Sequence, residues 1–213
     1  MRDFSFAVLI SGNGSNLQAM IDAIDEEKIT GKICCVLSNK EEAYGIKRAK
    51  KASIPTKVVN HKHFETREDF DSEMIKVLTG YNPNLIVLAG FMRILSPLFI
   101  EAYKGKILNI HPSLLPKYPG LDTHKRVLNS SDKFHGITVH FVDESLDGGP
   151  ICAQSFIKIR TPSVRKLELE IHKLEYDLYP KVINWFGEGL IKLKGGKVYF
   201  ENKEIKIINK DEN

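Results

Sequence analysis

The chain has 213 residues, enough for one large domain or for one domain with a small appendage. Its 42% hydrophobic and 27% charged residues are those of an ordinary soluble globular protein. The net charge of +4 is too small to imply a nucleic-acid partner, and it suits an anionic small-molecule ligand instead.

The cysteines and the N-terminus point to a cytoplasmic protein that needs no metal. The three cysteines lack the spacing of metal ligands, as do the histidines, and we expect Cys34 and Cys35 to be reduced core residues. A cytoplasmic location is the default for such cysteines. No apolar run approaches the roughly 20 residues of a membrane helix, and no signal peptide is recognisable. We therefore expect no membrane association.

The chain opens with a strand, a glycine-rich turn and a helix. Residues 6–10 are continuously apolar, as in a parallel strand that is buried on both faces. Two glycines follow at positions 12 and 14, and Ser15 or Asn16 is suited to cap the helix predicted from residue 17 onward. Free amide groups and the helix dipole favour a phosphate at such a turn. The turn matches neither a Walker loop nor a dinucleotide fingerprint, so a purely structural turn stays open.

Strands and helices continue to alternate as far as residue 90. The apolar residues that follow, at positions 91–97, fit either the core or the wall of a slot for a flat aromatic ligand, and their spacing favours the core. Arg67 is expected to be an exposed residue in the first turn of a helix. On the helix predicted at 44–52, the basic residues Lys47, Arg48, Lys50 and Lys51 are expected to form mostly a solvated face. The patterns predict strands at 33–37, 54–59 and 85–90, and helices at 44–52 and 64–78.

The most informative stretch is a short buried strand at residues 106–110 that ends in polar side chains. Asn109 and His111 are two residues apart, so they project from the same face of this strand. Pro112 ends the strand, because it cannot donate a backbone hydrogen bond. Open α/β sheets usually bind ligands at the carboxyl ends of their strands. The pair therefore predicts a functional site rather than two residues that only satisfy loop backbone groups.

The last third of the chain has a different pattern. Asp147 lies on a Gly-Gly-Pro loop after a predicted strand and could be an ordinary turn former. A long helix is expected at 163–186, which Pro180 would kink or split. Glu175 on this helix is expected to be solvated. Further predicted elements are a helix at 123–128, strands at 135–142 and 151–159, a β-hairpin beginning at 191, a possible strand at 204–208 and a disordered tail at 209–213.

These elements predict an α/β fold in a single domain. Alternating strands and helices indicate a doubly wound, Rossmann-like and mostly parallel sheet, with an antiparallel C-terminal portion. We expect the domain to span residues 1–208, with the hairpin at about 191–208 and the tail at 209–213.

Several motifs, taken together, resemble one enzyme family. They lie at residues 10–18, 88–95, 109–116, 135–136 and 146–150. In this order they resemble the folate-dependent formyltransferases, and among these the phosphoribosylglycinamide formyltransferases (glycinamide ribonucleotide transformylases) of purine biosynthesis. Pro150 fits this group better than the methionyl-tRNA formyltransferases. Asp122 stands where some relatives have a histidine, and we assign it no role.

The resemblance implies a set of site residues. Asn109, His111 and Asp147 would be catalytic. The nucleotide would be bound by four residues and the folate by six. The implied nucleotide-binding residues are Gly14, Ser15, Asn16 and Glu175, and the implied folate-binding residues are Arg67, Met92, Arg93, Ile94, Leu95 and Asn109.

The implied reaction moves a formyl group from 10-formyltetrahydrofolate to the amine of glycinamide ribonucleotide, without a metal. The Asn109 amide and a protonated His111 would stabilise the oxyanion, and Asp147 would favour the charged imidazole and relay a proton. Alternatives are a formyltetrahydrofolate hydrolase, a formyltransferase for another amine, or a non-catalytic nucleotide-binding module. The sequence leaves open a monomer or a homodimer.

Overall fold

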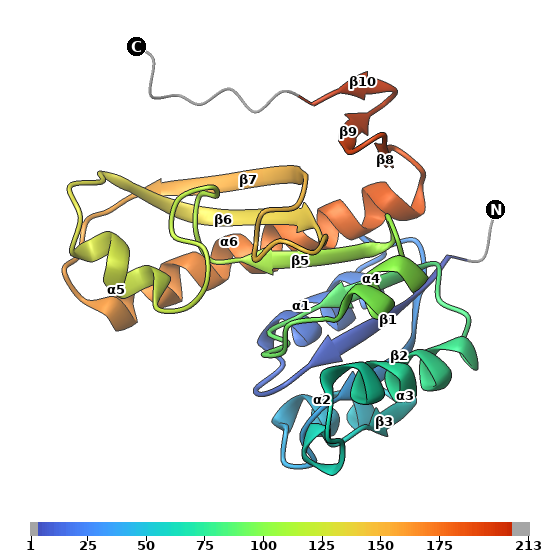
Figure 1. Ribbon diagram of the computed structural model, residues 1–213. Coiled ribbons are helices and arrows are strands. Elements are labelled where there is room, and N and C mark those ends of the chain that lie inside the picture. The colour runs from blue at the N-terminus through green and yellow to red at the C-terminus, as the bar shows by residue number, and fades with distance from the viewer. Residues whose placement is uncertain (1–3, 206–213) are drawn as a thin grey trace.

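The structure, a computed structural model, describes residues 4–205. Its main sheet has seven strands in the order β3-β2-β1-β4-β5-β6-β7 (Figure 1). The first five run parallel to one another, and β6 is antiparallel to both of its neighbours. This confirms the predicted doubly wound, mostly parallel sheet with an antiparallel later part. The strands are β1 (Ser5–Ile10), β2 (Lys32–Ser38), β3 (Thr56–Val58), β4 (Leu85–Leu88), β5 (Ile107–His111), β6 (Phe134–Phe141) and β7 (Ile151–Lys158).

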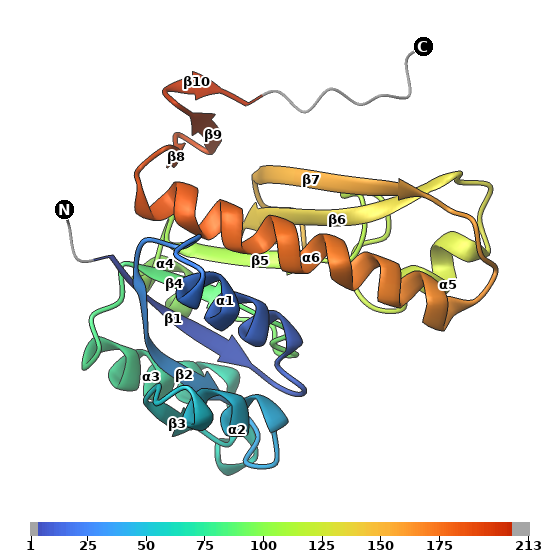
Figure 2. The same cartoon turned by 180° about the vertical axis from the view of Figure 1, so that it is seen from behind.

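Helices cover both faces of this sheet, which explains why its central strands are apolar throughout. In β1, Phe6, Val8 and Ile10 join the core on one face, and Ala7 and Leu9 join the core on the other. The first face is covered by α1 (Ser15–Asp25), α2 (Tyr44–Lys51) and α6 (Val164–Gly187), as Figure 2 shows for α1 and α6. The second face is covered by α3 (Arg67–Thr79) and α4 (Pro97–Ala102). The short elements η1 (His61–His63) and α5 (Thr123–Leu128) lie in the connections.

The direction of winding reverses between β1 and β4, and ligand-binding crevices form at such a reversal. The carboxyl ends of β1 and β5 point to the left in Figure 1, and β4 lies between these strands and parallel to both. Tyr179 of α6 is fully buried behind them, and its hydroxyl lies 3.0 Å from the carbonyl oxygen of Leu88 and 2.9 Å from that of Leu108. The buried phenol thereby ties α6 to the strand segments that lead into the crevice.

The C-terminal part confirms the expected hairpin and excludes a split of the long helix at Pro180. Ile191–Lys194 (β8) and Lys197–Phe200 (β9) form the expected hairpin, which Lys203–Glu204 (β10) extends into a second, three-stranded sheet. Pro180 does not split α6, which continues as one helix around the buried proline. The predictions for residues 206–208 and 209–213 lie outside the described residues. Within residues 4–205, none of the helices has both the length and the apolar character to cross a membrane.

Candidate active site

The turn after β1 is shaped by glycine. Gly14 is the N-cap of α1 with φ of +72°, and a Cβ atom placed there would lie 2.7 Å from the Cα of Gly45 in α2. Thr66, Ser96 and Ser163 cap α3, α4 and α6 with their side chains, whereas α1 has no side-chain cap. The expectation that Ser15 or Asn16 caps α1 is therefore wrong, because both lie inside the helix. The first-turn amides remain available to an anionic ligand.

Asn16 and Glu175 meet although they are far apart in sequence. The Asn16 Nδ2 atom donates a hydrogen bond of 2.9 Å to Oε2 of Glu175. Glu175 is only 5% exposed, so its expected solvation is wrong: α6 packs this side chain against α1. Burial raises the pKa of the Glu175 carboxyl, and the hydrogen bond from Asn16 opposes that shift. Oδ1 of Asn16 is buried without a hydrogen-bond partner, so it is an acceptor available to a ligand beside the turn.

His111 and Asp147 lie together at the end of β5. The Nε2–H group of His111 donates to the carbonyl oxygen of Tyr118 at 2.8 Å, and Nδ1 lies 3.4 Å from Oδ2 of Asp147. A carbonyl oxygen can only accept, so Nε2 must carry a proton. Both ring nitrogens thus face oxygen acceptors. The distance of 3.4 Å between Nδ1 and Oδ2 is longer than a strong charge-assisted hydrogen bond, so Nδ1 is not committed to Asp147.

Asn109 is oriented by a histidine that the sequence analysis did not select. Its Nδ2 atom donates to Nε2 of His140 at 3.2 Å, and Nδ1–H of His140 donates to the carbonyl oxygen of Phe141 at 2.9 Å. Burial lowers the pKa of His140, so its ring is neutral and Nε2 has a free lone pair. His140 Nε2 also lies 4.0 Å from Oδ1 of Asp147. The register of β5 and β6 pairs Asn109 with His140, a signal that appears only once the antiparallel pairing is known.

Asp147 is held in a strained backbone conformation. Its φ is +52°, uncommon for a residue with a side chain. The backbone N–H of Gly120 donates to Oδ2 of Asp147 at 2.8 Å, joining the loops that follow β5 and β6. A Cβ atom at Gly149 would come within 2.0 Å of the carbonyl oxygen of Phe141, so only glycine fits there. Asp147 is therefore more than an ordinary turn former.

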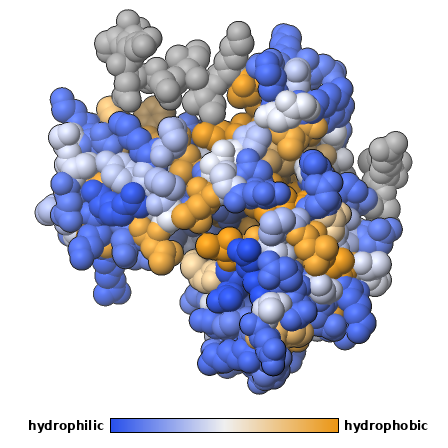
Figure 3. Space-filling model, in the orientation of Figure 1, coloured by the Kyte–Doolittle hydropathy of each residue, from blue (hydrophilic) through white to orange (hydrophobic). Residues whose placement is uncertain are grey.

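The segment after β4 presents apolar side chains to solvent. Met92 and Ile94 are 62% and 61% exposed, so the expectation that they belong to the core is wrong, whereas Phe91 and Leu95 are buried. Leu121 and Leu146, from the loops that meet at Asp147, are also exposed. Figure 3 shows hydrophobic side chains gathered around the hollow in the middle of this face. Such exposure is typical of a surface that binds an apolar ligand.

The backbone of this segment is fixed at both ends. The N–H group of Met92 donates to Oγ of Ser11 at 2.8 Å, and the N–H group of Ser96 donates to the buried carboxylate of Asp71 at 2.5 Å. Burial raises the pKa of Asp71. Arg67 begins α3 one turn before Asp71 and is exposed beside Glu68, as predicted. Within residues 4–205, no hydrogen bond or ion pair joins Arg67 or Arg93 to Asn109, His111 or Asp147.

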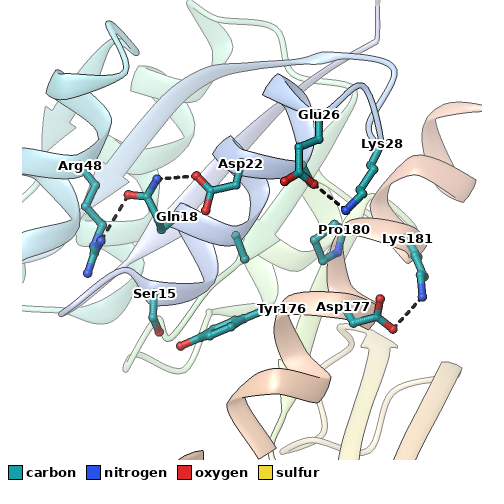
Figure 4. Close-up of a pocket in the computed structure, with 12 residues that line it drawn as sticks. Ser15, Gln18, Asp22, Glu26, Lys28, Arg48, Tyr176, Asp177, Pro180 and Lys181 are labelled. Atoms are coloured by element: carbon teal, nitrogen blue, oxygen red, sulfur yellow. Dashed lines mark hydrogen bonds and ion pairs between the residues drawn. The ribbon is translucent and has the colours of Figure 1, made fainter.

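A separate groove of about 620 Å³ lies between α1 and α6 (Figure 4). Ser15 and Tyr176 line one part of it, and Asn109, His111 and Asp147 do not. It therefore adjoins the turn after β1 rather than the site around His111. No group of three or more His, Cys, Asp or Glu side chains in the described part of the chain could hold a metal ion.

Comparison with known proteins identifies the family. The formyl transferase family matches residues 4–183. The phosphoribosylglycinamide formyltransferase of Escherichia coli is 45% identical over 94% of this chain and 95% of its own length, and that of Haemophilus influenzae is 48% identical over 93% and 94%. The solved structure of the phosphoribosylglycinamide formyltransferase of Coxiella burnetii is similar with a TM-score of 0.91 and 44% identity, covering 96% of this chain and 97% of that one. The resemblance inferred from the motifs is confirmed, and the chain belongs to the formyl transferase family.

Proposed function

We propose that this formyltransferase transfers the formyl group of 10-formyltetrahydrofolate to the amine of glycinamide ribonucleotide in purine biosynthesis. The observation that carries the proposal is the cluster of Asn109, His111 and Asp147, which lies at the same edge of the sheet as an uncapped, glycine-shaped helix start. The relatives named above carry the same activity in their names. A binding module would have no need of an amide and an imidazole held beside a carboxylate.

The nucleotide end of the site uses the start of α1. Gly14, Ser15 and Asn16 would bind the phosphate through backbone amides and the helix dipole. Glu175 would accept from a ribose hydroxyl, and Oδ1 of Asn16 has the free acceptor capacity to do the same. The ribose would thereby give Oδ1 of Asn16 a hydrogen-bond partner that the described residues do not supply.

The folate end uses the segment after β4. Exposed Met92 and Ile94 would contact the faces of the ring system, and the fixed backbone of residues 92–95 would pair with its polar edge. Arg67 and Arg93 are exposed cations suited to the folate carboxylates. Asn109 would lie between the two ends and contact the formyl oxygen. The two exposed apolar residues, Met92 and Ile94, lie between the buried anchors Phe91 and Leu95, which supports this assignment.

The chemistry is a direct acyl transfer. The amine lone pair forms a bond to the formyl carbon, and the carbonyl electron pair moves to oxygen. The free N–H of Asn109 and the Nδ1–H of His111 would donate to that oxyanion. Asp147 would accept the proton lost by the amine, directly or through water. Collapse of the intermediate breaks the bond to folate N10, which takes up a proton, so no covalent enzyme intermediate and no metal are needed.

Folate absorbance tests this proposal. The protein is mixed with 10-formyltetrahydrofolate, and the change is followed with and without glycinamide ribonucleotide. We expect turnover only when the nucleotide is present, with formation of formylglycinamide ribonucleotide. Equal turnover without the nucleotide would instead identify a hydrolase. Turnover with a different amine alone would identify another formyltransferase.

The proposal extends to the organisation of the protein. Residues 1–208 would form one formyltransferase domain, because one face of the sheet shares its apolar core with the hairpin through Ile191 and Val198. The substrates are small molecules, and we propose a cytoplasmic protein that acts as a monomer or a homodimer without nucleic-acid partners.

A further inference from the structure

Helix α2 is built against the turn after β1. The N–H group of Gly45 donates to the carbonyl oxygen of Gly12 at 3.1 Å. A Cβ atom at Gly45 would lie 3.2 Å from the Cα of Gly14 and 2.5 Å from Cδ1 of Ile10. The two glycines therefore bring two backbones into direct contact. The shape of the turn depends on α2 as well as on α1.

Arg48 of α2 binds the turn through hydrogen bonds from its guanidinium group. Nε of Arg48 donates to the carbonyl oxygen of Asn13, and Nη2 donates to the side-chain oxygen of Asn13, both at 3.0 Å. Nη1 donates to Oε1 of Gln18 at 3.2 Å, and Nε2 of Gln18 in turn bonds to Asp22, as Figure 4 shows. Lys47, Lys50 and Lys51 are exposed, as expected for a mostly solvated face, and Arg48 is the exception because it is partly buried.

The guanidinium group of Arg48 is itself held in place by the ring of Tyr44. Its guanidinium carbon lies 4.9 Å from the centre of the Tyr44 ring, within the range of a cation–π interaction. Arginine presents its donors in a rigid planar fork, whereas lysine is a flexible point charge. The pair of bonds to Asn13 therefore needs arginine. Residues 11–18 contain no lysine or arginine, so Arg48 brings a positive charge to a turn that has none of its own.

We propose that Arg48 is a positioning residue for the phosphate of the nucleotide. It holds the peptide before Gly14 so that the uncapped amides of α1 stay in place for the anion. Its charge further favours a phosphate dianion over a neutral ligand. The inference deepens the proposed function, on which it rests through the assignment of this turn to a phosphate.

Calorimetry with paired ligands tests the inference without catalysis. The ligands are glycinamide ribonucleotide, the corresponding riboside without phosphate, and ribose 5-phosphate. The variants are Arg48→Ala and Arg48→Lys. The matched control is Lys47→Ala. Lys47 immediately precedes Arg48 on α2, its Nζ atom lies 5.8 Å from the centre of the same Tyr44 ring, and no hydrogen bond within residues 4–205 joins it to the turn. Thermal unfolding is recorded for each variant.

The test compares how each variant changes the affinity for the ligands with a phosphate and for the riboside without one. Arg48→Ala should weaken the binding of ribonucleotide and ribose 5-phosphate about tenfold to a hundredfold, as expected for loss of charge-assisted hydrogen bonds. Riboside binding should stay within about twofold, as should all three ligands in the Lys47→Ala control. Arg48→Lys should recover part of the loss because it restores the charge.

Other outcomes overturn the inference. Equal losses for ribonucleotide and riboside would mean that Arg48 only stabilises the fold around the turn. Unchanged binding in Arg48→Ala would remove Arg48 from the site.

If Arg48→Ala does not fold, Arg48→Lys decides. Full phosphate affinity in a folded Arg48→Lys would show that the paired hydrogen bonds from the guanidinium to Asn13 are not needed for phosphate binding. If ribose 5-phosphate binds the native protein but the ribonucleotide does not, the proposed function fails while the role of Arg48 is still measured. If neither phosphate ligand binds, the turn is not a phosphate site.

Discussion

The two ends of the candidate site are built in different ways. At the proposed nucleotide end, the groups that would bind the ligand are mainly backbone amides of one continuous turn, which is shaped by Gly14 and supported by α2. At the reaction end, the groups are side chains from separate strands and loops, each oriented by another polar group. A site made of backbone is sensitive to shape and little affected by pH. A site made of imidazole, amide and carboxylate is sensitive to single atoms and to protonation.

The largest expected effect is the loss of turnover when His111 at the reaction end is replaced. In His111→Ala, the oxyanion loses a charged donor, which typically costs about a hundredfold to a thousandfold in turnover. Affinity for the nucleotide should hardly change, because His111 is not part of the turn after β1. Steady-state kinetics and calorimetry with the nucleotide together measure the two effects. Near-normal turnover would remove His111 from the mechanism.

The second effect concerns the carboxylate that links the two loops. Asp147→Asn keeps the size of the side chain and removes its charge. Turnover should fall about a hundredfold, the lower part of the range for general acid–base catalysis, and the acid limb of the rate–pH profile should flatten. The profile is measured from pH 5 to 9 with both substrates saturating. If the rate falls but the acid limb keeps its shape, Asp147 orients His111 and does not relay the proton.

At the nucleotide end, binding should depend on the shape of the turn rather than on a charged side chain. In Gly14→Val, the branched side chain must adopt a φ of +72° and displace Gly45, so the amides of the turn move. We expect the KM for the nucleotide to rise about tenfold, equivalent to 1.4 kcal/mol of binding free energy, with little change in the KM for folate. Gly80→Ala at the end of α3 is the control, because its backbone is helical. Equal damage to both substrates would place the phosphate elsewhere.

The same difference explains what the sequence could reveal. The turn after β1 is contiguous, and Asn109 and His111 lie on one strand, so local patterns were enough to select them. His140 and Arg48 were missed because their roles depend on strand pairing and on contact between helices, which are not local. Glu175 was misjudged by pattern alone, since helical spacing does not tell which face α1 covers. Met92 and Ile94 were misjudged because an apolar residue at a binding surface looks like a core residue in sequence.

The smallest expected effect concerns His135, which should change the pH dependence of stability but not catalysis. The buried His135 accepts or donates a hydrogen bond of 2.9 Å between its Nε2 and Nδ1 of His124. Burial, with smaller contributions from His124 and His111, lowers the pKa of His135 to about 4. The ordinary value in an unfolded chain is about 6.5. Between these values the unfolded chain binds a proton that the folded chain does not, so acidification through this range reduces the free energy of unfolding.

Replacing His135 should remove this contribution. One proton changes the free energy of unfolding by at most about 1.4 kcal/mol per pH unit. Measured by urea unfolding, this free energy should therefore decrease less steeply from pH 7 to pH 4 in His135→Gln than in the native protein. Asp71 and Glu175, whose pKa values are raised by burial, act in the opposite direction, but they are present in both proteins and cancel in the difference. Parallel curves would mean that His135 titrates alike in the folded and unfolded chains. Turnover at pH 7.5 should stay within a few-fold, because His135 is neutral there and is not part of the proposed oxyanion site.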